Sequence, residues 1–426
     1  MNQVTVIFLI LASVVLIASP RKWAPLPFLM TACYITLGQV IKVGPFHFMA
    51  IRILIAVGLI RVLIRREKPA GGLNGLDWLI IFWGITAISV SPFHKDPEAT
   101  FINHLGRAYD TLGIYLLMRS FVRTPEEIKG LISVIAIILV PVALEMFHEQ
   151  ITHKNLFSFL GGVGEIPEFR EGHFRSQGPF RHAIIAGTVG AVCLPLMVGI
   201  WRKFRLSAKI GMVACLTMIV TSFSSGPVMS LLYGILALFL WRYRHYTKQM
   251  FVAAILGYIF LDLVMKAPPY YLIARIDITG GSTGWHRARL IESAIEHLNE
   301  WWLFGTDYTR HWMPTGVSWS PDHTDITNHY IMMGVLGGIP LMFFFILQLW
   351  RGFKYVGSVV RNNINRDVQF LAWSLGSALF AHAVTCVGVS YFDQSFIFLY
   401  LTLAMISSMT MFKGKSGETD LAKRIK

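Results

Sequence analysis

Charged residues are scarce in this chain: Asp, Glu, Lys and Arg together make up 15% of its 426 residues. A soluble globular protein carries roughly 25% charged residues, so this shortage argues against a water-soluble domain. Cysteine is also rare, and the four cysteines lie one by one within apolar runs, at Cys33, Cys193, Cys215 and Cys386. That arrangement indicates neither a disulfide framework nor a zinc site. The chain also lacks the internal repeat that many transporters have.

What the chain has instead is long apolar runs. Apolar residues make up 54% of it, in blocks long enough to cross a bilayer, which predicts an integral membrane protein. Read in order, the blocks predict an all-α polytopic membrane protein with about 12–13 transmembrane helices.

The formal net charge of +14 resembles that of a nucleic-acid-binding protein. However, Lys and Arg recur in every second loop, which is the positive-inside pattern, so we expect a lipid bilayer and not nucleic acid as the partner.

Two connections are much longer than the others, and we name them by their residues, loop 147–181 and loop 266–329. Assigning the basic loops to the cytoplasm places about 25 of the 38 Lys and Arg on that side, and both long loops then face outward. In a Gram-negative cell they would lie in the periplasm. Connections of this length are uncommon in compact proteins and usually have a function.

The end of loop 147–181 is rich in arginine. Arg170, Arg175 and Arg181 fall within 12 residues, around the Gly178-Pro179 pair. Gly-Pro breaks helices and leaves backbone N–H groups free. Three guanidinium groups at the membrane surface suit a diphosphate, which accepts paired hydrogen bonds. The alternative role for these three arginines is contact with lipid head groups.

Loop 266–329 is expected to contain an amphipathic helix over residues of about 284–302. At 100° per residue, Arg289 shares one face with several glutamates, whereas Arg287 lies near the middle of the apolar face. A guanidinium on an apolar face is costly unless an anion meets it. Two interpretations are open: Arg287 pairs with a protein carboxylate or snorkels, or it binds a ligand phosphate beside the helix N-terminus.

A few ionisable residues fall within the predicted spans. Arg107 and Asp110 are three residues apart, so we expect them to face the same way and to pair. Arg52, Glu145 and His382 have no obvious partner nearby in the sequence. Charges inside a membrane usually mark a pathway or a site, and a structural ion pair between helices is the simpler alternative.

Four short motifs lie at the boundaries between loops and spans. In chain order they are Phe174–Phe180 (FRSQGPF), Ser224–Pro227 (SSGP), Gly284–Arg287 (GWHR) with the following run Ile295–Gly305, and Thr327–Tyr330 (TNHY) before Gly334–Gly338. In their order and placement these motifs resemble the O-antigen ligase and O-antigen polymerase family of bacterial cell-envelope glycosyltransferases. With the topology, the likeness extends over most of the chain.

The resemblance implies a GT-C-like membrane fold in the bacterial inner membrane, with the active site facing the periplasm. It implies transfer of a glycan from an undecaprenyl-diphosphate carrier to a sugar hydroxyl of a glycan acceptor, with inversion and without a metal or another cofactor. By position, Arg175 and Arg287 would bind the diphosphate, and we group Arg181 and Arg289 with them. Such groups would stabilise the charge that develops on the departing diphosphate.

The resemblance is incomplete at the expected proton acceptor. Ligases of the family typically read His-Asn at the start of the span after the large loop, whereas here the matching pair is Thr-Asn, ending at Asn328. We therefore expect His329 or Asp325 to act as the base, with Asp322 and His323 as alternatives, and Asn328 to contact the substrate. A capping or interfacial role is the other interpretation of His329.

Loop 266–329 also carries five tryptophans. Tryptophan most often anchors a protein at the membrane interface, but we expect Trp312 and Trp319 to stack on the glycan. The missing His-Asn pair favours a polymerase of O-antigen or exopolysaccharide over a ligase that attaches glycan to lipid A-core. A flippase or transporter of lipid-linked glycan is the alternative from another class. Against it stand the lack of repeats and the clustering of the candidate residues in outer loops.

Overall fold

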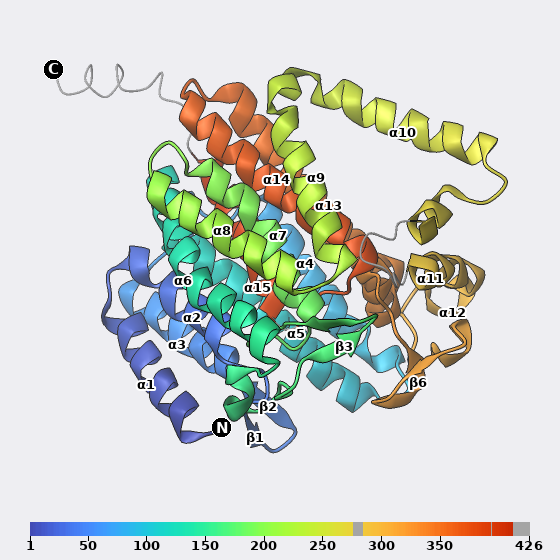
Figure 1. Cartoon of the computed structure of the whole chain (residues 1–426), viewed down its shortest axis with the longest axis horizontal. Coiled ribbons are helices and arrows are strands. Elements are labelled where there is room, and N and C mark those ends of the chain that lie inside the picture. The colour runs from blue at the N-terminus through green and yellow to red at the C-terminus, as the bar shows by residue number, and fades with distance from the viewer. Residues whose placement is uncertain (276–283, 393, 412–426) are drawn as a thin grey trace.

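The computed structural model describes residues 1–275, 284–392 and 394–411, and Figure 1 shows the whole chain. It is 73% helical. The α-helices are α1 (Gln3–Ala18), α2 (Pro25–Tyr34), α3 (Ala50–Arg65), α4 (Gly75–Ser89), α5 (Pro97–Phe121), α6 (Pro125–Thr152), α7 (Ala183–Gly199), α8 (Arg205–Thr221), α9 (Ser225–Phe239), α10 (Thr247–Val264), α11 (Gly284–Glu296), α12 (Leu298–Trp301), α13 (His329–Asn362), α14 (Arg366–Gly388) and α15 (Gln394–Met409).

Short elements fill the connections. The 3₁₀ helices are η1 (Arg21–Trp23), η2 (Ser91–Phe93), η3 (Leu156–Leu160), η4 (Leu240–Tyr246), η5 (Pro269–Arg275) and η6 (Arg310–Trp312). The strands pair as three antiparallel hairpins: β1 (Val40–Val43) with β2 (Phe46–Met49), β3 (Glu168–Arg170) with β4 (His173–Arg175), and β5 (Gly316–Val317) with β6 (Ser320–Thr324). Because each sheet has only two short strands, the fold class is all-α.

Several helices are long and apolar enough to cross a membrane. Within the described residues these segments are Gly75–Phe93, Pro125–Thr152, Ser225–Val264, His329–Asn362 and Arg366–Gly388. A helix rises about 1.5 Å per residue, so roughly 20 residues cross the hydrocarbon core. Shorter apolar helices, α1, α7 and α15, accompany them. The expectation of a helical membrane protein is confirmed.

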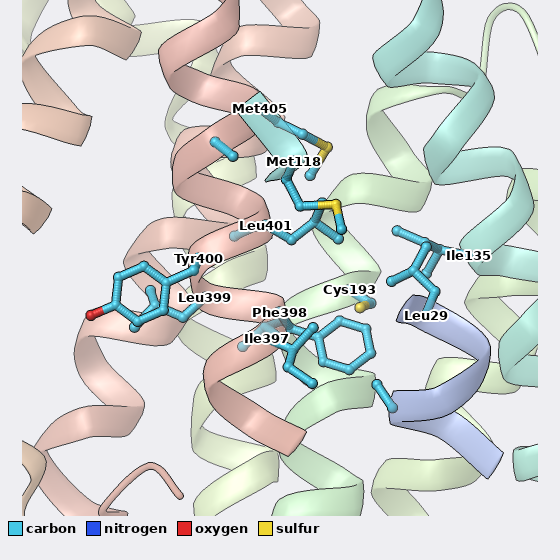
Figure 2. Close-up of a cluster of buried hydrophobic side chains, with 14 of the residues drawn as sticks. Leu29, Met118, Ile135, Cys193, Ile397, Phe398, Leu399, Tyr400, Leu401 and Met405 are labelled. Atoms are coloured by element: carbon cyan, nitrogen blue, oxygen red, sulfur yellow. The ribbon is translucent and has the colours of Figure 1, made fainter. Parts of the chain in front are cut away.

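The last helix, α15, forms the centre of the bundle. Nearly all of its side chains are buried, which fits a helix that is apolar on every side and packed on every side. Figure 2 shows its residues 397–405 surrounded by side chains of other helices. The labelled neighbours from α2, α5, α6 and α7 are Leu29, Met118, Ile135 and Cys193.

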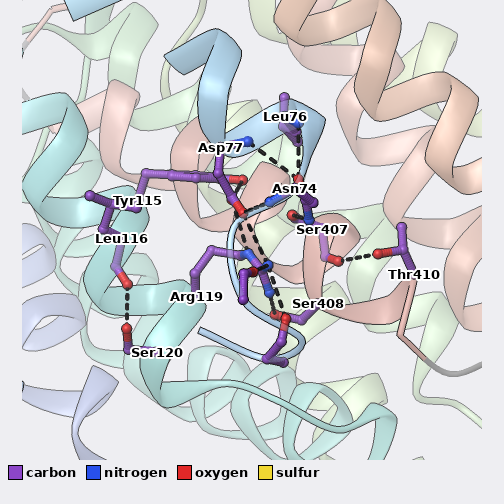
Figure 3. A network of polar contacts seen from close by, with 12 residues as sticks. Asn74, Leu76, Asp77, Tyr115, Leu116, Arg119, Ser120, Ser407, Ser408 and Thr410 are labelled. Carbon is purple, nitrogen blue, oxygen red and sulfur yellow. Dashed lines mark hydrogen bonds and ion pairs between the residues drawn. The ribbon is translucent and has the colours of Figure 1, made fainter. Parts of the chain in front are cut away.

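A buried polar network fastens α15 to α4 and α5 (Figure 3). Arg119 on α5 pairs with Asp77 on α4 at 3.2 Å, and neither side chain is exposed to solvent. The Tyr115 hydroxyl donates to the same carboxylate at 2.5 Å, while Arg119 also donates to the Ser408 hydroxyl of α15 at 3.2 Å. Because the charge is both paired and hydrogen-bonded, its burial is tolerated.

Two features of the first part of the chain could not be read from the sequence. The apolar run near Leu26–Val40 forms only a short helix, α2, and Val40 already begins the β1–β2 hairpin. Asp110 forms an ion pair with Arg52 of α3, at 2.8 Å, a contact that the sequence did not predict. This pairing also gives Arg52 the partner that its sequence neighbourhood did not show. A partner on another helix could not be found from spacing within one helix.

A kink in α13 seats loop 266–329 on the bundle. Gly338 has a left-handed φ of 72°, and an added Cβ there would lie 2.3 Å from the carbonyl oxygen of Leu303. Beside it, the backbone N–H of Ile339 donates to the Trp302 carbonyl at 2.7 Å. Gly334, one turn earlier, leaves room for the ring of Trp301. Only glycine fits such a close approach at a positive φ.

Helix α10 stands apart from the rest of the bundle (Figure 1). None of its residues is buried, and its aromatic contact with the bundle joins Phe251 to Trp350, with ring centroids 5.6 Å apart. From Met250 to Leu261 its side chains are apolar or aromatic on all sides, which favours lipid over water as the surroundings of this helix.

Candidate functional site

The β3–β4 hairpin carries two of the arginines singled out in loop 147–181. Its register places Glu168 opposite Arg175 and Arg170 opposite His173. The tight turn between the strands places Glu171 and Gly172 at positive φ values of 51° and 82°. Because directly opposed side chains point to the same face of a hairpin, Arg175 meets Glu168 in an ion pair of 2.9 Å.

The guanidinium of Arg175 is largely enclosed, with its side chain 12% exposed. It donates to the hydroxyl of Ser224, in the turn between α8 and α9, at 2.6 Å. Its Nε is buried and has no hydrogen-bond partner among the described residues. Burial lowers the pKa of Arg175 and the charge of Arg170 adds to this, while Glu168 opposes it. An unpaired buried donor is costly, so the site favours an anion that would accept from it.

The segment after Arg175 is held by the end of α6. One carboxylate oxygen of Glu149 accepts the backbone N–H groups of Gln177 and Gly178, at 3.0 and 2.8 Å. The Asn155 amide donates to the Gly178 carbonyl at 2.8 Å. Gly178 has a left-handed φ of 56°, which glycine adopts without strain. Glu149 therefore fixes the FRSQGPF turn, and sequence inspection missed it because it lies in the preceding helix.

Arg287 brings loop 266–329 to the same place. Its Nε–H donates to the carbonyl oxygen of Gly388, at the end of α14, at 3.0 Å, and the described residues give it no ion pair. Burial lowers its pKa first, the positive charge of Arg170 lowers it further, and Asp325 opposes the shift. Arg170 belongs to β3, so the two long loops meet here, as Figure 1 shows for the hairpin and the segment around α11.

His182 provides a second electrostatic link between the two loops. Its pKa is lowered first by partial desolvation and then by the positive charge of Arg181, to which Arg175 adds. Glu168 and Asp325, one from each loop, oppose the shift. Among the described residues, four arginines, Arg170, Arg175, Arg181 and Arg287, act in this cluster with two carboxylates, Glu168 and Asp325, so a further negative group would be stabilised there.

Arg289 lies on the opposite face of α11 and is engaged there. It pairs with Glu292 and, at 3.2 Å, with Glu296. The hydroxyl of Tyr271, in η5, donates to Glu292 at 2.6 Å. The structure therefore places Arg289 in an ion-paired surface network. Arg181 is exposed, and its charge acts on His182.

His329 is a buried residue at the start of α13. Its Nδ1 accepts the backbone N–H of Tyr391 at 3.0 Å, so the proton of the neutral ring is on Nε2. Its ring packs edge-on against Phe345, with centroids 4.9 Å apart. The neighbouring Asn328 caps α13, since its side-chain oxygen accepts from the N–H groups of Tyr330 and Ile331.

The remaining predicted residues differ in exposure. Asp325 is exposed, and its backbone carbonyl accepts from the His286 ring at 3.1 Å. Trp312 is 2% exposed and packs in a small core with Trp301. Trp319 is 72% exposed. Since Trp312 offers no open ring face, sugar stacking in this loop falls to Trp319, which stays a prediction.

The described residues contain one group of histidine and acidic side chains close enough to hold a metal: His297, Glu300 and His311. It lies at the far end of α11 from Arg287.

No protein-family model matches the chain, and no curated protein matches it significantly. The chemistry of the site follows from its own residues: arginines from two loops lie within electrostatic reach of one another, which suits a ligand with two adjacent negative groups.

Proposed function

We propose that this protein is a glycosyltransferase of the bacterial inner membrane that uses a glycan carried on undecaprenyl diphosphate as donor and a sugar hydroxyl as acceptor. One observation carries the proposal: the charge of Arg170 acts on both Arg175 and Arg287, which come from two separate loops, and among the described residues Arg175 keeps a buried Nε without a partner while Arg287 has no ion pair. A diphosphate supplies negative charge and accepts bidentate hydrogen bonds from guanidinium groups. The resemblance of the four loop motifs points to the same donor.

The proposed topology has twelve spans: α1, the eight helices from α3 to α10, and the three from α13 to α15. Helix α2, with 10 residues, is too short to cross the bilayer, and the twelve spans make a GT-C-like arrangement. Both long loops then lie on the periplasmic side, where the arginine cluster meets the head group of a lipid-linked donor. The hydrophobic tail of the donor would remain in the bilayer beside the helices.

In the proposed reaction, the acceptor oxygen attacks the anomeric carbon and a bond forms between them. The bond between that carbon and the diphosphate oxygen breaks, and the anomeric configuration inverts. Arg175 and Arg287 hold the departing diphosphate and stabilise the charge that develops on it, an effect commonly of about 3–4 kcal/mol for a well-placed group. The proton of the acceptor hydroxyl passes to a base.

Asp325 is the better supported base of the two candidates. It is an exposed carboxylate whose charge acts on Arg287 and His182. In His329 the Nδ1 lone pair is engaged by the backbone N–H of Tyr391, which leaves only the protonated nitrogen. We therefore assign His329 to positioning the segment around Tyr391, and Asp325 to proton transfer.

A polymerase is favoured over a ligase because Thr-Asn replaces the His-Asn pair of the ligases. Deleting the gene in its host and separating the glycans on a gel tests this. If the protein is a polymerase, the deletion strain contains only single repeat units. If it is a ligase, the deletion strain accumulates long polymer bound to the carrier. If it is a flippase, single units accumulate on the cytoplasmic face of the membrane. An unchanged glycan profile would contradict all three assignments.

A further inference from the structure

A second cluster of polar side chains lies at the other end of α11, away from the arginines. His297 lies between α11 and α12, Glu300 lies in α12, and His311 lies in η6. Their ligand atoms all lie within 4.8 Å of one another. We propose that these three residues bind a divalent transition-metal ion, with Zn²⁺ as the best fit, which fastens η6 to α12.

His297 is oriented as a metal ligand would be. Its Nδ1 lies 2.9 Å from the backbone carbonyl oxygen of Ser293. A carbonyl oxygen only accepts, so Nδ1 carries the proton and the lone pair of the neutral ring is on Nε2. Histidines that bind metals commonly donate their second ring N–H to a carbonyl or a carboxylate, which fixes both the tautomer and the direction of the ligand.

The carboxylate of Glu300 is also oriented by a neighbouring side chain. The indole N–H of Trp312 donates to its Oε2 at 3.1 Å, and this leaves Oε1 directed at the ring of His311, 3.0 Å from Nε2. One carboxylate oxygen of Glu300 is therefore fixed by Trp312, and the other faces the cluster.

The donor set selects the class of metal. Two imidazole nitrogens and one carboxylate oxygen suit zinc and related transition metals, whereas magnesium and calcium prefer oxygen ligands throughout. Ligands about 2.0–2.2 Å from a tetrahedral ion lie roughly 3.3–3.6 Å apart, so the 3.0 Å between Glu300 Oε1 and His311 Nε2 needs to widen by only about 0.5 Å. The ion would take the place of the proton between these two residues, and the proton of the neutral His311 ring would move to Nδ1. Three protein ligands leave a fourth position for water.

The site is separate from the arginine cluster. His297 is ten residues beyond Arg287, about 15 Å along a helix. Around it, the Ser293 hydroxyl donates to the Trp312 carbonyl and the Trp301 indole donates to the Ala294 carbonyl, both at 2.9 Å. A metal bound here would stabilise the packing of η6 and α12 against the end of α11. Its role is to make the end of α11 more rigid, and α11 is the helix that also carries Arg287.

Metal analysis tests the proposal directly. The full-length protein, purified in detergent and stripped with a chelator, is titrated with Zn²⁺ and its bound metal is measured by elemental mass spectrometry. We expect one zinc per chain, and affinity at least about tenfold weaker in His297→Ala and His311→Ala. His47→Ala removes an exposed histidine of the β1–β2 hairpin and serves as the matched control with unchanged binding.

A subtler variant guards against misfolding. Trp312→Phe keeps the ring in the small core but removes the N–H that holds Glu300, so we expect about a 10–100-fold loss of zinc affinity. Zinc should also slow proteolysis within residues 284–330 of the wild type and not of His311→Ala. The proposal is overturned if the stripped wild type takes up no zinc, or if the histidine and Trp312 variants bind it as tightly as the wild type. Either result would reduce the cluster to an ordinary His–Glu hydrogen bond.

Discussion

Arg287 donates its Nε–H to the carbonyl oxygen of Gly388 at 3.0 Å, which ties loop 266–329 to the last residue of α14. This contact uses the inner edge of the guanidinium and leaves its two terminal nitrogens for a ligand. Lysine has a single terminal nitrogen and cannot do both. The geometry of Arg287, and not only its charge, is therefore part of the proposed site.

Replacement of Arg287 by lysine should accordingly be damaging. We expect Arg287→Ala to reduce glycan elongation by about 10²–10³-fold, and Arg287→Lys by about tenfold or more because charge remains without the paired donors. Elongation rates in membrane vesicles with matched protein amounts measure this. A fully active lysine variant would show that charge alone suffices and would remove the bidentate contact from the account.

The kink of α13 offers a stability test. Gly338→Ala places a Cβ against the Leu303 carbonyl at a positive φ, so we expect a loss of about 2 kcal/mol or more in the free energy of unfolding. The control is Gly257→Ala in α10, where an added Cβ meets nothing within 4 Å and helix propensity predicts a gain of up to about 1 kcal/mol. Thermal unfolding in detergent compares the two. Equal midpoints would contradict the close contact at Gly338.

Two ion pairs of different burial allow a second comparison. Arg119→Ala strands Asp77 without its partner where neither side chain is exposed, and we expect a destabilisation of about 3–5 kcal/mol. Arg202→Ala breaks a pair with Asp367 in which the side chains are 70% and 47% exposed, and we expect about 0–1 kcal/mol. The same unfolding measurement applies. A small effect at Arg119 would mean that the network in Figure 3 contributes little to holding α15 in place.

The membrane class and the amphipathic character of α11 could be predicted because both depend on the local order of apolar and polar residues. Sequence inspection placed Arg287 and Arg289 on different faces of that helix, and the structure shows them there. The expected helix over residues of about 284–302 is divided at His297 into α11 and α12. After the break, Trp301 packs against Gly334 of α13, a contact that no local pattern reveals.

Contacts between distant segments could not be predicted in the same way. Glu149 holds the turn at Gly178, and Arg52 pairs with Asp110, but nothing in the spacing of these residues links them. The cluster of His297, Glu300 and His311 was missed for a related reason. Two of its members are close in sequence, and the third is brought to them only by the packing of Trp312.

The central claim is that guanidinium groups from two loops grip one diphosphate. Titration of the purified protein with undecaprenyl diphosphate, read by native mass spectrometry, tests it most directly. We expect Arg175→Ala and Arg287→Ala each to weaken binding by about 10–100-fold, the range for a hydrogen bond to a charged group. Arg244→Ala, an arginine of η4 that donates to the Trp241 carbonyl, should bind as the wild type does. Equal affinity in all four proteins would contradict the claim.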